Sequence, residues 1–477
     1  MDGFWIVSIV YACILFLVCL RILYETHSST KTLAYLLFCI FFPVVGIIFY
    51  LAFGVNYWKT KLYASKLAED EKLLREMHEN LPPQDKHSQF PDDDSSELAT
   101  MIVSSLRSPV TYNNLVKLLI NGEEKFPEVL EAISKARHHI HLEYYIFEQD
   151  KIGSQLIELL ITKAKEGVEV RFIYDDFGSP TIKKKIEKKM TDAGICVHPF
   201  SKVHFYLLAN RINYRNHRKI IVVDGQTGFV GGINVSDKYI NSDPKELYWR
   251  DTHIRIDGSG VFYLQYLFMA DWNFCCDEKL KPEEKYFIES IPPMGNTILQ
   301  IAGSGPDSAQ PSILFSILQA IYLAKEEILI TTPYFIPGDS IIDALRIAAL
   351  SGITVKLLVP GKCDSKLVNS ASRANYNELL QAGVEIYVYQ KGFVHAKTLV
   401  ADSKLSVVGT SNMDHRSFQL NFEVNAIVYD PAFSEELRKT FFADLKHAEQ
   451  LDAKLWNDRS FMQQLPEKLA RLLSPAL

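Results

Sequence analysis

The chain has 477 residues and a formal net charge of -6 at pH 7, from 51 Lys and Arg against 57 Asp and Glu. A chain of this length can form two or three domains. Most nucleic-acid-binding proteins are basic, so the acidic balance disfavours a nucleic-acid partner. The 7 cysteines include no CxxC pair, which indicates free thiols in a reducing compartment and no zinc site.

Two apolar runs begin the chain. Residues 4–20 are apolar apart from Ser8, and residues 33–53 are uncharged. The second run is long enough to cross a bilayer, and the first is near the lower limit. A signal peptide is an alternative for the first run, but its start lacks a basic region and no small-residue cleavage site follows. A buried core helix is an alternative for the second, although its aromatic ends favour a membrane span. The sequence therefore predicts a two-helix transmembrane hairpin over residues 1–57.

The distribution of basic residues predicts an orientation. Few lie between the runs, whereas the following flank is rich in them: Lys59, Lys61, Lys66, Lys72 and Arg75. By the positive-inside rule, the remaining chain lies in the cytoplasm and the protein is a multi-pass protein of the cell membrane. Residues 58–100 combine a charged helical stretch with a segment rich in proline and aspartate. We expect a juxtamembrane helix and a mobile linker there.

The rest of the chain alternates predicted strands and helices twice, over residues 101–276 and 297–477. The stretch from Ala164 to Arg171 (AKEGVEVR) has a counterpart from Ala349 to Lys356 (ALSGITVK). A helix that leads into a buried strand in this way is typical of an α/β domain. The pattern predicts two tandem α/β domains. The amphipathic end of the second, from Thr440, is expected to form a helix packed on the core.

One motif occurs in both halves. His217-x-Lys219-x-x-x-x-Asp224 is repeated as His395-x-Lys397-x-x-x-x-Asp402. In each copy an apolar run follows the lysine, then a turn signal and a second apolar run, which predicts a strand, a tight turn and a strand. Alternate residues of a strand share a face, so each His and Lys should point the same way. A single copy would fit a core histidine beside a solvated lysine, but the repetition favours a functional pair.

The aspartate of each motif has a different expected role. Asp224 and Asp402 lie five residues after the lysine, at the end of the predicted strand. They should therefore point away from the His and Lys side chains. We expect each to accept hydrogen bonds from turn backbone rather than to carry protons.

The repeated motif resembles that of the phospholipase D superfamily. The resemblance implies two tandem phospholipase D-like α-β-α domains related by a pseudo-twofold axis, with both motifs in one active site. It also implies phosphodiester exchange through a phosphohistidine, in which one histidine attacks phosphorus and the other protonates the leaving alkoxide. No metal or other cofactor is expected, because Lys219 and Lys397, with Asn234 and Asn412, would hold the phosphoryl oxygens.

The apolar N-terminal region and both halves together resemble the bacterial cardiolipin synthases of the phospholipase D type. That resemblance implies a phosphatidyltransferase that joins two phosphatidylglycerols at the membrane and releases glycerol. By the family's order, His217 is the nucleophile and His395 the general acid. One carboxylate follows each motif, Asp251 and Glu423, and the family implies that such acids orient the catalytic histidines.

Three other functions fit parts of the pattern. A membrane-bound phospholipase D would use the same residues, with water or a different alcohol in place of phosphatidylglycerol as the acceptor. A nuclease of the same superfamily is disfavoured, since those are commonly short chains with a single motif. A non-catalytic membrane scaffold is disfavoured by two intact motifs. The sequence leaves the acceptor, the order of the two histidines and the oligomeric state open.

Overall fold

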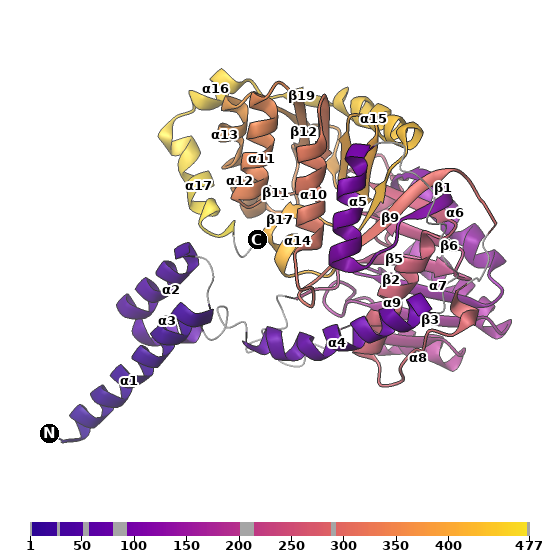
Figure 1. Cartoon of the computed structure of the whole chain (residues 1–477), viewed down its shortest axis with the longest axis horizontal. Helices are drawn as coiled ribbons and strands as arrows, with labels where there is room; N and C mark the ends of the chain where they lie inside the picture. Colours follow the sequence, from indigo (N-terminus) through magenta and orange to yellow (C-terminus); the bar gives the residue numbers. More distant parts are fainter. Residues whose placement is uncertain are drawn as a thin grey trace. The chain divides into compact units, whose positions relative to one another are not determined.

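A computed structural model describes residues 2–25, 29–50, 57–79, 93–200, 214–287 and 292–474 (Figure 1). The chain divides into two compact units. The small unit comprises Met1–Ala68 with Val203–Tyr214, and the large unit comprises Glu69–Lys202 with Arg215–Leu477. Most of the predicted proline-rich linker lies outside the described residues.

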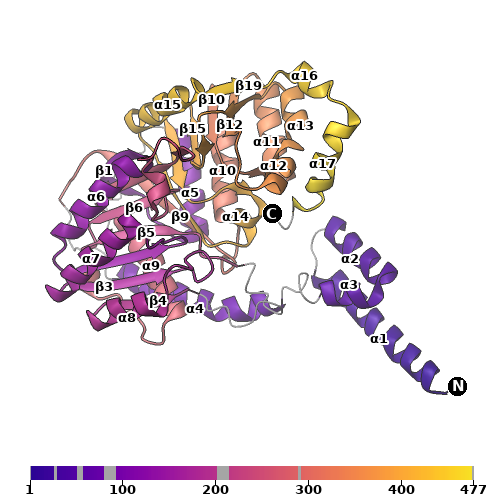
Figure 2. The ribbon, with the colours of Figure 1, turned by 180° about the vertical axis from the view of Figure 1, so that it is seen from behind.

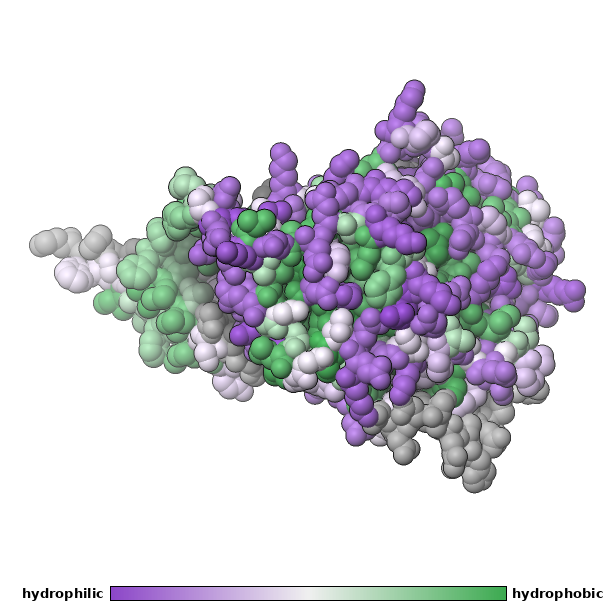
Figure 3. All heavy atoms as spheres, turned by 90° about the horizontal axis from the view of Figure 1, so that it is seen from above, coloured by the Kyte–Doolittle hydropathy of each residue, from purple (hydrophilic) through white to green (hydrophobic). Residues whose placement is uncertain are grey.

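The small unit begins with the apolar helix α1 (Asp2–Glu25). Within it, Ser8–Glu25 is the one stretch among the described residues that is long and apolar enough to span a membrane. Large apolar side chains are exposed along much of the helix, and hydrophobic residues gather on the surface of this unit in Figure 3. The N-terminal helix is therefore suited to membrane association.

The second apolar run is not the uninterrupted helix that its length predicts. It forms α2 (Ser29–Phe41) and α3 (Pro43–Phe49), with a break at Phe42. Proline begins α3 because it has no N–H for the preceding turn and its ring blocks a straight continuation of the helix. An added Cβ on Gly46 would lie 2.6 Å from the Cα of Cys39, so the missing side chain lets α3 pack back on α2.

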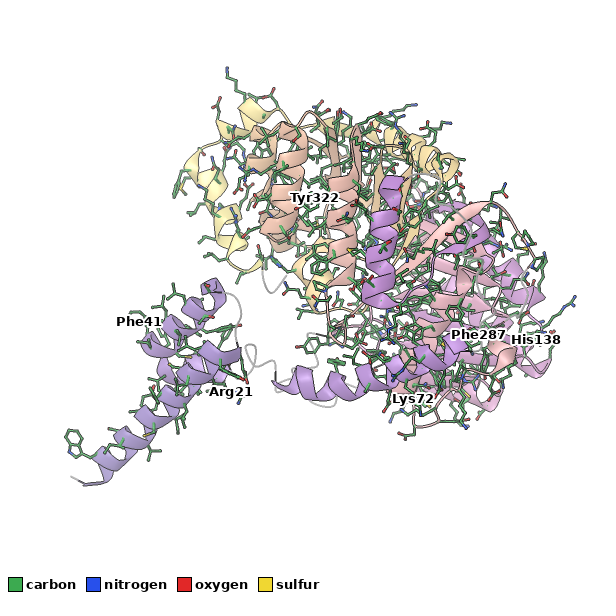
Figure 4. All side chains as sticks on the ribbon, in the orientation of Figure 1. Arg21, Phe41, Lys72, His138, Phe287 and Tyr322 are labelled. Atoms are coloured by element: carbon green, nitrogen blue, oxygen red, sulfur yellow. The ribbon has the colours of Figure 1, made fainter. Side chains whose placement is uncertain are left out.

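Neither short helix has the length of a membrane span by itself. At 1.5 Å per residue, the 13 residues of α2 cover roughly 20 Å and the 7 residues of α3 roughly 10 Å. Phe41, at the end of α2, is 72% exposed (Figure 4). The second membrane crossing therefore remains a prediction.

The large unit is built on one mixed sheet. The strands of the first half are β1 (Thr111–Ile120), β2 (His139–Tyr144), β3 (Glu169–Tyr174), β4 (Cys196–Pro199), β5 (Lys219–Val223), β6 (Thr227–Gly231) and β8 (Thr252–Asp257). Those of the second half are β9 (Thr297–Ser304), β10 (Glu327–Thr331), β12 (Thr354–Pro360), β13 (Glu385–Tyr389), β15 (Thr398–Ala401), β16 (Leu405–Gly409), β18 (Glu423–Val428) and β19 (Ala448–Gln450). Together they form a 15-stranded sheet.

The strand order is duplicated about the centre of this sheet. β1 and β9 pair antiparallel there. Outward from them the order is β8-β6-β5-β2-β3-β4 on one side and β18-β16-β15-β10-β12-β13 on the other, with β19 added at the edge. In both halves the strand within the motif, β5 or β15, pairs antiparallel with the next strand, β6 or β16. The duplication confirms the predicted tandem α/β halves.

Helices cover both faces of each half (Figures 1 and 2). In the first half, α6 (Asn121–Lys135) and α7 (Lys151–Lys165) share a hydrophobic core with alternate residues of β2, while α9 (Val261–Cys275) packs on its other residues. In the second half, α10 (Ser312–Leu323) and α11 (Asp339–Leu350) form the corresponding core. Strand alternation thus gives each half two covered faces.

One helix crosses a predicted domain boundary. The helix α5 (Asp93–Leu106) precedes the first half, yet its Leu98 and Ile102 lie in the core of the second half. It therefore crosses the predicted start of the first domain at residue 101. In the second half, β10 ends at Thr331, and Tyr334 lies in the connection to β11 (Phe335–Ile336). Pro333 explains why β10 ends there, because proline cannot donate to a strand ladder.

Candidate active site

The two motifs have the same local geometry. The ammonium group of Lys219 donates a hydrogen bond to the main-chain oxygen of His217, 2.7 Å away. Lys397 makes the same bond to the main-chain oxygen of His395. The chain through each motif is extended, so the His and Lys side chains lie on one face, as the spacing predicts. All four side chains are buried.

Each motif is held in place by the other half of the large unit. The N–H of His217 donates to the main-chain oxygen of Phe422, 2.9 Å away, and the N–H of His395 donates to that of Arg250, 2.7 Å away. The residues that follow these two acceptors are the two predicted carboxylates. The pairing therefore places the carboxylate of each half beside the histidine of the other.

The side chains complete this crossed arrangement. Nδ1–H of His217 donates to Glu423, whose carboxylate oxygens lie 2.9 and 3.0 Å away. Nδ1–H of His395 donates to Oδ2 of Asp251 at 2.6 Å. Both motifs and both carboxylates thus form one site. In each imidazole, Nε2 is the nitrogen left to react with a substrate.

The surroundings keep both histidines neutral. Burial lowers the pKa of His217 to about 4, although the nearby Glu423 charge opposes this effect. Burial, followed by the charge of Lys397, lowers the pKa of His395 to about 4 as well. A neutral imidazole is a nucleophile, so either histidine is in the correct state to attack at neutral pH.

The carboxylates remain ionised despite their burial. Burial by itself would raise the pKa of Glu423, but His217 and Lys219 more than offset it, and the pKa lies below its usual value. Burial would also raise the pKa of Asp251, but Lys397 and His395 more than offset this effect, and the pKa lies below its usual value. Ionised carboxylates on Nδ1 fix the tautomer of both rings and stabilise the positive charge that either acquires.

The two lysines titrate near neutral pH. Burial lowers the pKa of Lys219 to about 7 and that of Lys397 to about 8, although Glu423 and Asp251 oppose the shift. The charge of Lys397 also lowers the pKa of Lys219, which places both ammonium groups in the same site. An anionic substrate between them would favour their charged forms.

The two motif aspartates act on backbone outside their own turns. Both occupy left-handed backbone conformations, with φ of 52°. Asp224 accepts from the backbone N–H groups that precede and begin β2: Arg137, His138 and His139. Asp402 accepts from the equivalent groups at β10: Lys325, Glu326 and Glu327. Each aspartate therefore ties the motif hairpin to the neighbouring strand.

The two predicted asparagines differ. Oδ1 of Asn234 accepts from the N–H of Ile146 at 3.2 Å, and its Nδ2 donates to the hydroxyl of Tyr239 at 2.8 Å. Asn234 is thus occupied by structural bonds. Oδ1 of Asn412 is buried with no hydrogen-bond partner among the residues described. An amide oxygen is an acceptor, so this atom can bind a substrate hydroxyl but not a phosphoryl oxygen.

Several site residues were not predicted. The hydroxyl of Thr410 donates to Glu423. The aromatic rings of Tyr145 and Trp249 lie against His217 and His395, with ring centroids 5.0 and 5.5 Å apart. Tyr145 and Trp249 carry no spacing signal. Thr410 aligns with Gly232 of the first half, and this difference between the two copies is the sequence signal that could have identified it.

A charged cluster lies on the other face of the first motif. The side chain of Asn216 donates to Glu143, and Arg218 pairs with Asp271. Arg218 Nε also donates to the main-chain oxygen of Glu423, 3.2 Å away. Burial, followed by the Asp271 charge, raises the pKa of Glu143. Asn216 and Arg218 thus anchor the segment that carries the reactive side chain of His217.

The arrangement provides the groups that a phosphoryl transfer needs. It combines two imidazoles, an ionised carboxylate on each, and two ammonium groups within one buried site. One imidazole can attack phosphorus while the other transfers a proton, and the ammonium groups can neutralise the phosphoryl oxygens. Among the described residues, no group of three or more His, Cys, Asp or Glu is placed to hold a metal ion.

Comparison with known proteins agrees with this site. Residues 129–251 and 317–445 match the family described as "Cardiolipin synthase, PLD-like domain", and residues 5–54 match "Phospholipase_D-nuclease N-terminal". The cardiolipin synthase of Alkalihalophilus pseudofirmus is 41% identical over 98% of this chain and 93% of its own. The major cardiolipin synthase ClsA of Bacillus subtilis is 41% identical over 99% of this chain and 98% of its own.

A solved structure shows the same fold at low sequence identity. The phosphatidylserine synthase of Haemophilus influenzae aligns with a TM-score of 0.60 and 13% identity, over 80% of this chain and 96% of its own. This alignment shows that the fold is shared, and the two matched PLD-like domains correspond to its two halves.

Proposed function

The chain belongs to the cardiolipin synthases with phospholipase D-like domains, and we propose that it transfers a phosphatidyl group from one phosphatidylglycerol to a second. The products are cardiolipin and glycerol. The observation that carries the proposal is the crossed pairing of each motif histidine with a carboxylate of the other half, beside two lysines. That arrangement supplies a nucleophile and a proton donor at the same phosphodiester.

In the first step His217 is the proposed nucleophile. Its Nε2 attacks phosphorus and a P–N bond forms, while the P–O bond to glycerol breaks. The anionic phosphodiester favours a protonated His395, whose free-enzyme pKa is about 4, and this imidazolium protonates the leaving alkoxide. Lys219 and Lys397 neutralise the charge that grows on the non-bridging oxygens.

The second step reverses the roles. Neutral His395 takes the proton from a glycerol hydroxyl of the second phosphatidylglycerol. The resulting oxygen attacks phosphorus, a P–O bond forms, and the P–N bond to His217 breaks. Asp251 stabilises the imidazolium of His395 in both steps, because its carboxylate accepts from Nδ1–H.

Reconstituted full-length protein supplied with labelled phosphatidylglycerol tests the reaction. We expect equal amounts of cardiolipin and glycerol, and diversion to phosphatidylethanol when ethanol is added. Phosphatidic acid as the main lipid product would instead identify a phospholipase D that uses water. Label trapped at high pH on the peptide that contains His395, rather than His217, would reverse the assigned order.

We also propose that the large unit lies on the cytoplasmic side of the membrane. Basic residues are sparse between the apolar runs and frequent after them, as the positive-inside rule requires for this orientation. A protease added outside intact cells should leave the large unit uncut. A tag at the N-terminus tests the number of crossings: two would protect it, and a single crossing by α1 would expose it.

A further inference from the structure

The C-terminal helix of the large unit packs with its polar side inward. α17 (Phe461–Arg471) follows the short α16 (Ala453–Asn457) and begins with a capping box. Its Glu467 is buried and forms ion pairs with Arg373 and Arg459, at 2.9 and 2.7 Å. The expected helix is present, and its contact with the core combines this charged cluster with an apolar contact of Ala470.

The apolar side of the same helix faces outward. Five large apolar side chains of α17 and the turn after it, here called the α17 stripe, are at least half exposed: Phe461 65%, Met462 72%, Leu469 55%, Leu472 76% and Leu473 50%. At 3.6 residues per turn, these positions fall within one arc of roughly 120° of the helix. Leu465, in the same arc, is partly buried. A helix that packed on the core for hydrophobic burial would turn this arc inward. The outward arc therefore indicates a surface that meets another apolar phase.

The helix that carries this stripe is connected to the active site by packing. Ala470, on the inner side of α17, packs with Ile336 of β11 and with α12 (Lys366–Arg373). β11 pairs with β17 (Met413–Asp414), which directly follows Asn412 of the site. The inner side of α17 is thus connected through β11 and β17 to the segment that carries Asn412.

We propose that the α17 stripe inserts into the interface of an anionic bilayer and holds the active site at the membrane surface. The inference rests on the proposed function, because a phosphatidylglycerol must bring its phosphate to the histidines while its acyl chains remain in apolar surroundings. Lys468 and Arg471 border the stripe, and basic residues beside an apolar arc favour anionic lipid headgroups. Arg471 also lies 3.3 Å from Glu378.

Photo-crosslinking in the full chain tests the contact directly. A benzoylphenylalanine at position 469 should crosslink to lipid when the protein is reconstituted in vesicles of phosphatidylcholine and phosphatidylglycerol. The matched control is position 347, since Ile347 on α11 has an equal exposure of 56% and lies toward the end of α11 remote from β11. Lipid crosslinks at 469 and not at 347 would support the proposal. Equal lipid labelling at both positions, or crosslinks from 469 to a second copy of the chain, would overturn it.

Activity on two forms of the substrate separates surface binding from chemistry. The double variant Leu469→Glu with Leu472→Glu should form cardiolipin from bilayer phosphatidylglycerol on the order of tenfold more slowly, because two charged side chains oppose insertion. With monomeric short-chain phosphatidylglycerol its rate should equal that of the wild type. The control pair Ile347→Glu with Leu350→Glu should leave both rates unchanged.

The outcomes distinguish this inference from the proposed function. An unchanged rate on bilayers, or an equal loss on both substrates, would contradict the role of the α17 stripe. A wild-type protein that makes no cardiolipin from either substrate would instead contradict the proposed function. The crosslinking result does not depend on turnover and would still decide whether the stripe contacts lipid.

Discussion

The two halves of the large unit use one reactive arrangement with different supports. In the second half, the long side chain of Glu423 reaches across to His217 and accepts a further bond from Thr410. In the first half, the shorter Asp251 reaches His395 and lies over Gly232, where an added Cβ would approach its Oδ1 to 2.1 Å. The longer Glu423 and the shorter Asp251 thus make the same kind of hydrogen bond to a histidine, although different neighbours position them.

The opposite faces of the motifs differ more. Beneath His217, the positions on either side carry Asn216 and Arg218, which bind buried acids. Beneath His395, the equivalent positions are the buried apolar residues Val394 and Ala396. The duplicated motif therefore determines the reactive face, whereas the supporting face differs between the halves. It also leaves the two histidines chemically similar but in different electrostatic surroundings.

Removing either histidine should have the largest effect. His217→Ala and His395→Ala each remove a group that both half-reactions need, so cardiolipin synthesis by purified protein should fall at least on the order of a hundredfold. Circular dichroism should show that both variants are folded. Near-normal turnover of one variant would show that the two halves do not share one site.

The orienting carboxylates should come next. Glu423→Gln and Asp251→Asn keep the shape of each side chain but remove the charge that fixes the imidazole, and turnover should fall roughly 10- to 100-fold. The two losses should be similar, because each acid keeps a second hydrogen bond to its side chain and an arginine bond to its main-chain oxygen. Steady-state rates of both variants measure the two losses. A loss more than tenfold larger in one variant would show that the two carboxylates do not contribute equally to turnover.

The lysines should set the alkaline limit of the pH profile. With pKa values of about 7 for Lys219 and about 8 for Lys397, the ammonium forms are present below these values and are lost as the pH rises through them. The kcat/KM for phosphatidylglycerol should therefore decline above neutral pH, since phosphoryl charge is no longer balanced. Lys219→Arg keeps its charge at all these pH values and should move the decline to higher pH, at a lower maximal rate. An unchanged alkaline limb in this variant would assign the titration to another group.

The sequence predicted the reactive face because that face depends on local geometry. The spacing of His217 and Lys219 places them on the same side of an extended segment, and the turn after Asp224 closes the hairpin. The crossed partners could not be derived in this way. Which half supplies Glu423 to His217 depends on a pairing between residues 206 positions apart, and no local pattern records that pairing.

Other features depended on close packing that the sequence does not show. The sequence predicted one continuous helix over the second apolar run, but the contact of Gly46 with Cys39 that packs α3 on α2 exists only in three dimensions. The amphipathic end of the chain was visible too, but its pattern does not say which side faces the core. The buried Glu467, with its two arginine partners, decided that orientation.

The motif aspartates should show the smallest effect on turnover, and that effect should follow stability. Asp224→Asn replaces a carboxylate that accepts three backbone N–H groups by an amide with one acceptor oxygen, which should lower the free energy of unfolding by about 1–3 kcal/mol. Asp402→Asn should cost a similar amount, because its three bonds are equivalent. Thermal denaturation in a defined detergent measures both variants, and initial rates well below the transition should fall only severalfold. A variant with wild-type stability and no activity would instead give that aspartate a direct part in the reaction, and would separate the halves if it occurred in only one of them.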